Sequence, residues 1–340
     1  MKAAFVIDSN KVAIEEIDKP VPAENEVLIK VEIAGVCGSD LHLFHGTHAF
    51  RKPPAILGHE VAGTVVEVGK NAKKYQIGDR VTVLPQVACG TCEYCRKGLE
   101  NLCINKVVPG TPKWIGTFVE YFPSPEQVVY PLNDNISMAV GALIEPLAVA
   151  VRVINKISVP EKDSIVILGT GSIGMLTLVV ARERGYKNII CTDTAEFNRK
   201  MALELGASAA VDPLSEDVPA RVRELTGGRG ADVAIIAAGA PNIFDQATAS
   251  LHKCGQVGIV AMITKNIPVY TYSTVFNELT VFGAMTYSTK DFEDAWEMVN
   301  NGLDLSKFVT QTLDLDHTQQ ALDVLSEKKE NVIKVQVKVS

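Results

Sequence analysis

The sequence predicts a two-domain α/β protein, with an irregular β-barrel-like domain followed by a doubly wound parallel sheet. Its 340 residues exceed a single ordinary core and are enough for two domains. Up to about Val151, short β-type runs are broken by Gly, Pro and Asp. After Val159, buried strands alternate with amphipathic helices, which is typical of a parallel sheet.

The composition excludes several classes of protein. Hydrophobic residues make up 47% and charged residues 21% of the chain, as in ordinary globular proteins. A net charge of −7 argues against nucleic acid as a partner. No apolar run approaches the roughly 20 residues that span a bilayer, and the N-terminus lacks the pattern of a signal peptide. We therefore expect a cytoplasmic protein without a membrane partner.

Three β-type runs define the first domain, "EVLIKVEIAGV", "HEVAGTVVEVG" and "DRVTVLP", at 26–36, 59–69 and 79–85. The second half opens with the strand "DSIVILG" (163–169) and the helix "SIGMLTLVVARERG" (172–185). The alternation then continues to a sixth strand at 279–285, which we expect to form an edge of the sheet. Two amphipathic helices and the alternating strand "NVIKVQVKV" complete the chain.

Four cysteines lie within one short segment. Their spacing, Cys89-x2-Cys92-x2-Cys95-x7-Cys103, fits four thiolates around a tetrahedral zinc ion. In a reducing compartment, closely spaced cysteines more often bind metal than form disulfides. Because all four positions are thiols, no coordination site stays open for a substrate. The spacing therefore predicts a structural zinc site.

A second, open metal site is indicated by residues elsewhere in the first half. Cys37 ends a β-run in the Gly-flanked turn "GVCGSDLH", and His59 and Glu60 begin another in "LGHEVAG". Glu145 precedes a proline in "ALIEPLAVAV". One thiolate, one imidazole and one carboxylate leave a fourth position free, as in catalytic zinc sites.

The segment "GTGSIG" predicts a dinucleotide site, because it follows a predicted strand and begins a predicted helix. Gly169 permits the turn, Gly171 admits the pyrophosphate, and Gly174, next to Ile173, allows close packing of the helix. Asp193, nineteen residues beyond Gly174, ends the next strand. Its carboxylate would accept the ribose hydroxyls and repel a 2′-phosphate, which favours NAD over NADP.

Together these motifs resemble the zinc-dependent medium-chain alcohol dehydrogenases over essentially the whole chain. The resemblance includes "GHEVAGTVVEVGKNA", the four-cysteine segment and the dinucleotide fingerprint. With Glu in "IEPLAVAV", the chain is most similar to the polyol (sorbitol) and L-threonine dehydrogenase branch. The resemblance implies a GroES-like catalytic domain at 1–150 and 286–340, and a Rossmann domain at 151–285.

The resemblance also implies roles for single residues. Cys37, His59 and Glu145 would hold the catalytic zinc, and Glu60 would be a ligand or an immediate neighbour with a catalytic role. Ser39 and His42 would form a proton relay. Arg199 stands one place beyond the usual basic residue near the adenosine, where this chain has Asn198.

Other positions depart from the sorbitol-type pattern or lack a role. Leu43 and Phe44 replace Tyr-Trp, and Thr286 replaces an Arg, which makes a long polyol substrate less secure. We expect surface or loop positions for His45, His48, His252 and His317, and buried positions for Cys191 and Cys254.

The sequence therefore predicts an enzyme with two zinc ions per subunit that oxidises a secondary alcohol to a ketone with NAD. The substrate would be a polyol, a vicinal diol or an amino alcohol. L-threonine 3-dehydrogenase remains an alternative, and so does a non-catalytic NAD-binding regulatory protein. The resemblance further implies a homodimer or homotetramer.

Overall fold

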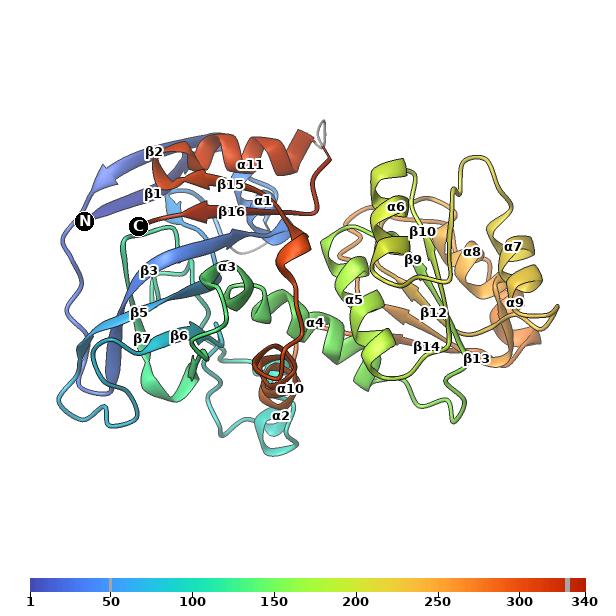
Figure 1. Ribbon diagram of the computed structural model, residues 1–340, viewed down its shortest axis with the longest axis horizontal. Coiled ribbons are helices and arrows are strands. Elements are labelled where there is room, and N and C mark those ends of the chain that lie inside the picture. Colours follow the sequence, from blue (N-terminus) through green and yellow to red (C-terminus); the bar gives the residue numbers. More distant parts are fainter. Residues whose placement is uncertain (49–50, 328–330) are drawn as a thin grey trace. The chain divides into compact units, whose positions relative to one another are not determined.

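A computed structural model describes residues 1–48, 51–327 and 331–340 of the chain. The chain forms two compact units (Figure 1). The first contains Met1–Glu145 and Ser288–Ser340, and the second contains Pro146–Tyr287. The first unit is thus discontinuous in sequence, because the chain leaves it and later returns to it.

Two sheets form the framework of the first unit. In the smaller, β1 (Lys2–Asp8) lies between β2 (Lys11–Glu16) and β4 (Ala55–Ile56). The larger has the order β15-β16-β3-β5-β6-β8, with β7 (Tyr121–Pro125) also paired with β3. Its strands are β3 (Glu26–Val36), β5 (Glu60–Val68), β6 (Arg80–Val83), β8 (Val129–Pro131), β15 (Val309–Asp314) and β16 (Lys334–Lys338).

Short helices connect these strands. They are α1 (Gly38–Phe44), α2 (Glu93–Arg96), α3 (Met138–Gly141), α10 (Thr289–Asn300) and α11 (Thr318–Glu327), with 3-10 turns at Glu100–Leu102, Glu126–Val128, Ser306–Phe308 and Leu315–His317. Helix α11 packs on β15 and β16 (Figure 1). Helix α4 (Ile144–Asn155) carries the chain from the first unit into the second.

The second unit is a doubly wound parallel sheet with the order β11-β10-β9-β12-β13-β14. The strands are β9 (Ser164–Leu168), β10 (Asn188–Thr192), β11 (Ala209–Val211), β12 (Ala231–Ile236), β13 (Leu251–Ile259) and β14 (Thr280–Gly283). The helices are α5 (Ser172–Glu183), α6 (Glu196–Glu204), α7 (Val218–Leu225), α8 (Ile243–Ala249) and α9 (Tyr272–Phe276). From β9 the chain moves outward through β10 to β11, and it then returns to the other side of β9 and moves through β12 and β13 to β14. The strand order therefore reverses between β9 and β12.

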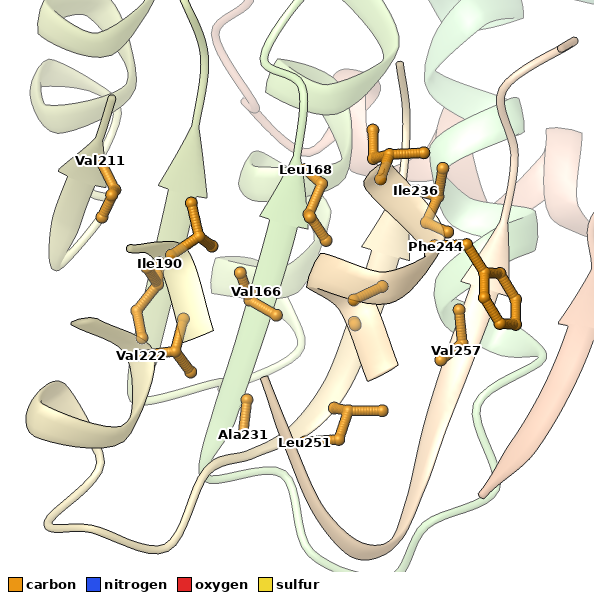
Figure 2. Close-up of a cluster of buried hydrophobic side chains, with 14 of the residues drawn as sticks. Val166, Leu168, Ile190, Val211, Val222, Ala231, Ile236, Phe244, Leu251 and Val257 are labelled. Carbon is orange, nitrogen blue, oxygen red and sulfur yellow. The ribbon is translucent and has the colours of Figure 1, made fainter. Parts of the chain in front are cut away.

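One face of this sheet is covered by α7 and α8. Figure 2 shows Val166 of β9 and Ile190 of β10 in a buried cluster with Val222 of α7 and Phe244 of α8. Strands with side chains buried on both faces read as continuous apolar runs. Such runs, "SIVIL" in β9 and "VAII" within β12, made this sheet visible in the sequence.

The two-domain α/β fold predicted from the sequence is confirmed, with six strands in the parallel sheet. Two details differ. Strand β13 begins at Leu251, so His252 and Cys254 lie within it, and Cys254 is exposed at φ 62° rather than buried. Cys191 is buried as expected. The window Met138–Asn155 is long and apolar enough to span a bilayer by composition, yet 72% of it is buried inside the protein, as in core helices.

Candidate metal centres and dinucleotide site

The four clustered cysteines bring their sulphur atoms within 4.8 Å of one another. The Cys92 and Cys95 sulphurs lie 3.5 Å apart, and those of Cys89 and Cys95 lie 4.0 Å apart. Sulphurs at about 2.3 Å from a tetrahedral zinc ion stand roughly 3.8 Å from each other, whereas a disulfide needs about 2.05 Å. The geometry therefore fits a closed zinc site and no disulfide.

The backbone around this cluster favours thiolates. The pKa of the Cys89 thiol is lowered to about 5, chiefly by the backbone N–H groups of Thr91 and Cys92. Burial and the neighbouring thiols raise the pKa of Cys95 to about 12. A divalent cation that binds here would therefore displace the proton of the Cys95 thiol.

A second group contains Cys37, His59 and Glu60, whose ligand atoms also lie within 4.8 Å of one another. Cys37 links β3 to α1, and Glu60 begins β5, which pairs with β3 in antiparallel register. The sheet therefore brings together residues that are more than twenty positions apart. A thiolate, an imidazole and a carboxylate form a donor set suited to zinc.

Glu60 is fully buried and is held by a lysine from the last strand. The Lys334 ammonium lies 2.7 and 2.9 Å from the two Glu60 carboxylate oxygens, and it also contacts the Val36 carbonyl oxygen at 3.3 Å. Gly35 stands opposite Glu60 in the β3–β5 register, and a Cβ there would lie 1.8 Å from Glu60 Oε2. The missing side chain of Gly35 therefore makes room for the carboxylate.

Burial alone would lower the pKa of Lys334, but the negative charge of Glu60 raises it, with smaller contributions from Cys37 and Glu145. Lys334 is thus a buried ammonium ion at the metal-ligand group. Glu145, itself 6% exposed, is not among the ligand atoms within 4.8 Å in the part of the chain that the structure describes. Its assignment as a ligand stays a prediction.

Asp40 contacts the backbone of Cys37 and the ring of His59, and so helps to hold both candidate ligands in place. Its buried carboxylate accepts hydrogen bonds from the Cys37 N–H at 3.1 Å and the Gly58 N–H at 3.4 Å, and it lies 3.5 Å from His59 Nδ1. Burial would raise its pKa, but the charge of His59 lowers it, and Arg51 contributes in the same sense. With Nδ1 facing Asp40, His59 keeps Nε2 for a metal ion.

The two predicted relay residues, Ser39 and His42, both lie in α1 and are partly exposed. Leu43 and Phe44, which follow them, are 0% and 1% exposed, so they belong to the domain core and offer no surface to a substrate. The replacement of Tyr-Trp by these two residues is therefore weaker evidence against a long polyol substrate than the sequence suggests.

His48 and Arg51 form a pair near this group. The Arg51 backbone N–H and side-chain Nε lie 3.0 and 3.2 Å from the two ring nitrogens of His48. Only one of these can be a hydrogen bond to a neutral imidazole, since its other nitrogen carries a proton. Burial lowers the pKa of His48, and the charges of Arg51 and His42 lower it further.

The predicted dinucleotide turn joins β9 to α5. Gly169 has φ +94°, and a Cβ there would lie 2.3 Å from Ala238 Cβ; at Gly174 it would lie 1.9 Å from the Gly169 carbonyl oxygen. Gly171 differs, because a Cβ there would meet no described protein atom within 4 Å. The backbone before α5 is thus bare where a pyrophosphate would approach, and no side chain caps this helix. The turn fits a bound dinucleotide.

Asp193 follows β10 directly and is fixed from several sides. One oxygen accepts from the Thr170 N–H at 2.8 Å and the Asn198 amide at 3.1 Å, and the other accepts from the Ala195 N–H at 2.9 Å. The second oxygen has one donor among the described residues and can accept ribose hydroxyls. Arg199 instead binds the Asp193 and Thr194 carbonyl oxygens.

The sequence reasoning missed Asp40, Lys334, His48 and Arg51. Asp40 lies in the quoted motif "GVCGSDLH" and could have been noticed as an acid three residues after a ligand. Lys334 gives no such signal. In "IKVQVK" it alternates with apolar residues and reads as solvent-facing, but β16 lies between β15 and β3 and is buried on both faces.

Comparison with known proteins agrees with this architecture. Residues 23–134 match the alcohol dehydrogenase GroES-like domain, and residues 172–301 match the zinc-binding dehydrogenase family. The chain is 33% identical to a sorbitol dehydrogenase of Bacillus subtilis, over 99% of this chain and 97% of the relative. It is 34% identical to an L-threonine 3-dehydrogenase of Pyrococcus furiosus, over 83% and 80% of the two chains.

Solved structures are similar as well. A 2R,3R-butanediol dehydrogenase from Bacillus subtilis superposes with a TM-score of 0.92 at 31% identity, covering 100% of this chain and 99% of the other. A zinc-binding dehydrogenase from Sinorhizobium meliloti, solved with NADP, gives 0.90 at 30% identity, covering 99% and 98%. The chain belongs to the zinc-dependent medium-chain alcohol dehydrogenase family, in the branch that includes sorbitol and L-threonine dehydrogenases.

Proposed function

We propose that this protein oxidises a secondary alcohol to a ketone, with Cys37, His59 and Glu60 holding a catalytic zinc ion and NAD accepting the hydride. The observation that carries the proposal is the convergence of these three ligand atoms within 4.8 Å, in a chain that also has a separate four-cysteine group. Glu145 stands close enough for its charge to act on Lys334, and it serves as a further ligand or as a neighbour of the site.

When bound, zinc supplies a Lewis acid that lowers the pKa of an alcohol hydroxyl. Two residues of the chain then transfer the hydroxyl proton to solvent. Ser39 accepts it from the substrate hydroxyl, and His42, three residues further along α1, passes it toward solvent. The alcohol thus loses one proton to this relay and one hydride to NAD, which balances a two-electron oxidation.

The second unit supplies the nucleotide site. The bare turn at Gly171 receives the pyrophosphate, and Asp193 accepts the ribose hydroxyls of the adenosine. A carboxylate in that position repels a 2′-phosphate, so we expect NAD to be preferred, although a relative at 30% identity binds NADP. Asn198 contributes no positive charge that would offset the repulsion.

Names of the relatives suggest the substrate class. Sorbitol, 2R,3R-butanediol and L-threonine are all secondary alcohols with a neighbouring polar group. A polyol, a vicinal diol or an amino alcohol is therefore the primary expectation, and L-threonine 3-dehydrogenase is the alternative. Retention of Cys37, His59, Ser39 and His42 argues against a purely regulatory NAD-binding protein.

Strand β14 supports a homodimer, which could assemble further into a tetramer. It is an edge of the parallel sheet, and Val281 within it is 40% exposed. Nearby α9 exposes Val275 at 76% and Phe276 at 62%. An apolar edge strand without Lys or Pro needs a covering partner, and pairing about a two-fold axis provides one. We place the protein in the cytoplasm, with no nucleic-acid or membrane partner.

A substrate screen tests the proposed activity. NAD reduction is followed with the zinc-loaded protein on sorbitol, 2,3-butanediol, L-threonine and an amino polyol, with Cys37→Ser as the control for the metal site. Turnover of at least one alcohol by the unmodified protein, lost in the variant, supports the proposal. NAD binding without turnover of any alcohol would favour the regulatory alternative.

A further inference from the structure

Thr286, which follows strand β14, has a strained backbone. Its φ is 44°, in the left-handed region that a β-branched residue rarely occupies. The other non-glycine residues with positive φ in the described chain have local reasons for it. Asn10 turns the β1–β2 hairpin, Glu278 follows the C-cap of α9, and Cys254 lies where the register of β13 with β12 shifts. At position 286, glycine or asparagine would make the same turn at a lower cost.

The side-chain hydroxyl of Thr286 is also unsatisfied. Its Oγ1 is buried and has no hydrogen-bond partner among the residues that the structure describes. A buried hydroxyl without a partner has lost its hydration and gained no bond in exchange. Backbone strain and an unpaired polar group at the same residue are typical of a place where a ligand provides the missing partner.

The strand order of the second unit indicates which ligand reaches Thr286. All its strands are parallel, so the segments that follow them lie at one edge of the sheet. The proposed pyrophosphate turn follows β9, and Asp193, which is proposed to bind the adenosine, follows β10 on one side of it. The nicotinamide half of the dinucleotide then extends to the other side, across β12 and β13 toward β14. Thr286 lies at the end of this path.

A second unpaired hydroxyl lies at the beginning of the same path. Ser172 begins α5 directly after Gly171, and its buried Oγ also lacks a partner in the described part of the chain. Thr170, on the other side of Gly171, differs because its Oγ1 lies 3.2 Å from Asp193 Oδ2. The unpaired hydroxyls thus occur at the β9 turn and after β14, the two ends of the path that the nicotinamide half would follow.

We propose that the Thr286 hydroxyl binds the carboxamide group of the nicotinamide ring of NAD. This inference rests on the proposed use of NAD and deepens it, because it assigns a contact to the half of the cofactor that accepts the hydride. A threonine hydroxyl both donates and accepts hydrogen bonds, and a carboxamide offers both partners. By holding the carboxamide, Thr286 would restrain rotation of the ring and so orient it for the reaction.

Equilibrium binding tests this contact without turnover. The Kd values of NAD and of ADP-ribose, which lacks the nicotinamide ring, are measured by calorimetry with the zinc-loaded protein. Thr286→Val keeps the β-branched shape and removes only the hydroxyl. It should raise the Kd of NAD about threefold to tenfold and leave that of ADP-ribose unchanged. Thr286→Ser keeps the hydroxyl and should retain most of the affinity for NAD.

Thr274→Val is the matched control. It removes another buried and unpartnered threonine hydroxyl of the second unit, from α9, which precedes the opposite end of β14. Both Kd values should stay unchanged in this variant. A loss of NAD affinity equal to that of Thr286→Val would show that the effect is not specific to the edge where the cofactor binds, and would contradict the inference.

Thermal unfolding separates a binding role from a structural role. Without cofactor, Thr286→Val should unfold at the same temperature as the unmodified protein or slightly above it, because it removes a polar group that has no protein partner. A lower unfolding temperature would assign the hydroxyl to the fold and overturn the inference. Unchanged affinity for NAD, or an equal loss of affinity for NAD and ADP-ribose, would overturn it as well. A protein that shows the expected binding pattern and oxidises no alcohol would contradict the proposed function alone, whereas a protein that binds no NAD would contradict both.

Discussion

The Lys334 ammonium lies 2.7 Å from Glu60 Oε1 in a place where both side chains are almost inaccessible to water, at 3% and 0%. The pair joins the last strand of the chain to a candidate zinc ligand. Two buried charges in such contact compensate each other, and removal of one leaves the other without a partner.

Lys334→Met should therefore destabilise the metal-free protein by about 3 to 5 kcal/mol. Zinc would provide Glu60 with another cationic partner, so the loss should be smaller in the zinc-loaded protein. Thermal unfolding with and without a chelator measures the loss of stability in the metal-free and the zinc-loaded protein. Lys334→Arg serves as the charge-preserving control. An equal loss in the two forms would show that Glu60 does not contact the metal.

The three-residue metal group should be needed for turnover, and the four-cysteine group should be needed for stability. Cys37→Ala and Cys95→Ala should each reduce zinc content from two ions to one per subunit, measured by elemental analysis. Cys37→Ala should abolish turnover in a folded protein, whereas Cys95→Ala should lower thermal stability or assembly, because a closed site contributes folding energy. If Cys95→Ala kept full stability and lost only activity, the assigned roles would be reversed.

Cofactor preference depends on Asp193 and its neighbour. Asp193→Ser with Asn198→Arg removes a carboxylate that repels the 2′-phosphate and adds a cation beside it. The ratio of kcat/KM for NADP to that for NAD should rise at least tenfold. Asp193→Ser alone is the control, because it tests the loss of repulsion without the new charge. An unmodified enzyme that already prefers NADP would contradict the assignment.

Asp232, at the start of β12, should make stability depend on pH. It is fully buried and accepts hydrogen bonds from the Ser164 N–H at 2.7 Å and from Arg229 Nη2 at 2.6 Å, and it lies 2.9 Å from His252 Nε2. Burial would raise its pKa, but the bonds from Ser164, then His252 and Arg229, lower it. Its contribution is thus complete above the ordinary aspartate pKa of about 4 and is lost as pH falls further.

Asp232→Asn should cost about 3 kcal/mol near neutral pH. The difference from the unmodified protein should shrink as pH falls below about 4. Thermal unfolding of both proteins from pH 7 to 3.5 measures this difference in stability. The control is Asp163→Asn, which removes the exposed ion-pair partner of Lys187 at the same end of the sheet. A gap that stays constant with pH would contradict the lowered pKa.

The free edge of β14 allows a selective test of dimer formation. Ala284 N–H donates to the Ile259 carbonyl oxygen of β13. Because N–H groups alternate in direction along a strand, the Val281 N–H points away from β13. Val281→Pro therefore removes a donor from the outer edge only, and light scattering should show monomers or aggregates. Val281→Ala keeps the donor and should remain dimeric. An active monomer from the unmodified chain would defeat the proposal.

Sequence reasoning was strongest where one local pattern determines the structure. Bounds of β3 match the predicted run at 26–36, and the parallel strands were visible as apolar runs because both of their faces are buried. The cysteine spacing and the glycine turn are also local, so their geometry could be anticipated.

Sites built from distant segments could not be anticipated in this way. Lys334 meets Glu60 across 274 positions, and Asp232 meets Ser164 across 68. Charged residues in such pairs look like solvent-facing positions until the sheet order is known. The assignment of Glu145 as a zinc ligand stays a prediction for a similar reason, since its place relative to the other ligands depends on how α4 leaves the first unit.

The return of the chain to its first unit has a consequence for synthesis on the ribosome. Strand β16 supplies both the neighbour of β3 and the counter-charge of Glu60, yet it is translated after the whole second unit. The nascent first 145 residues therefore carry a buried acid without its partner, while residues 146–287 can fold as a complete unit. Loss of β16, by premature termination or proteolysis, would thus reach the metal-ligand group directly, although Glu60 precedes Lys334 by 274 positions in the sequence.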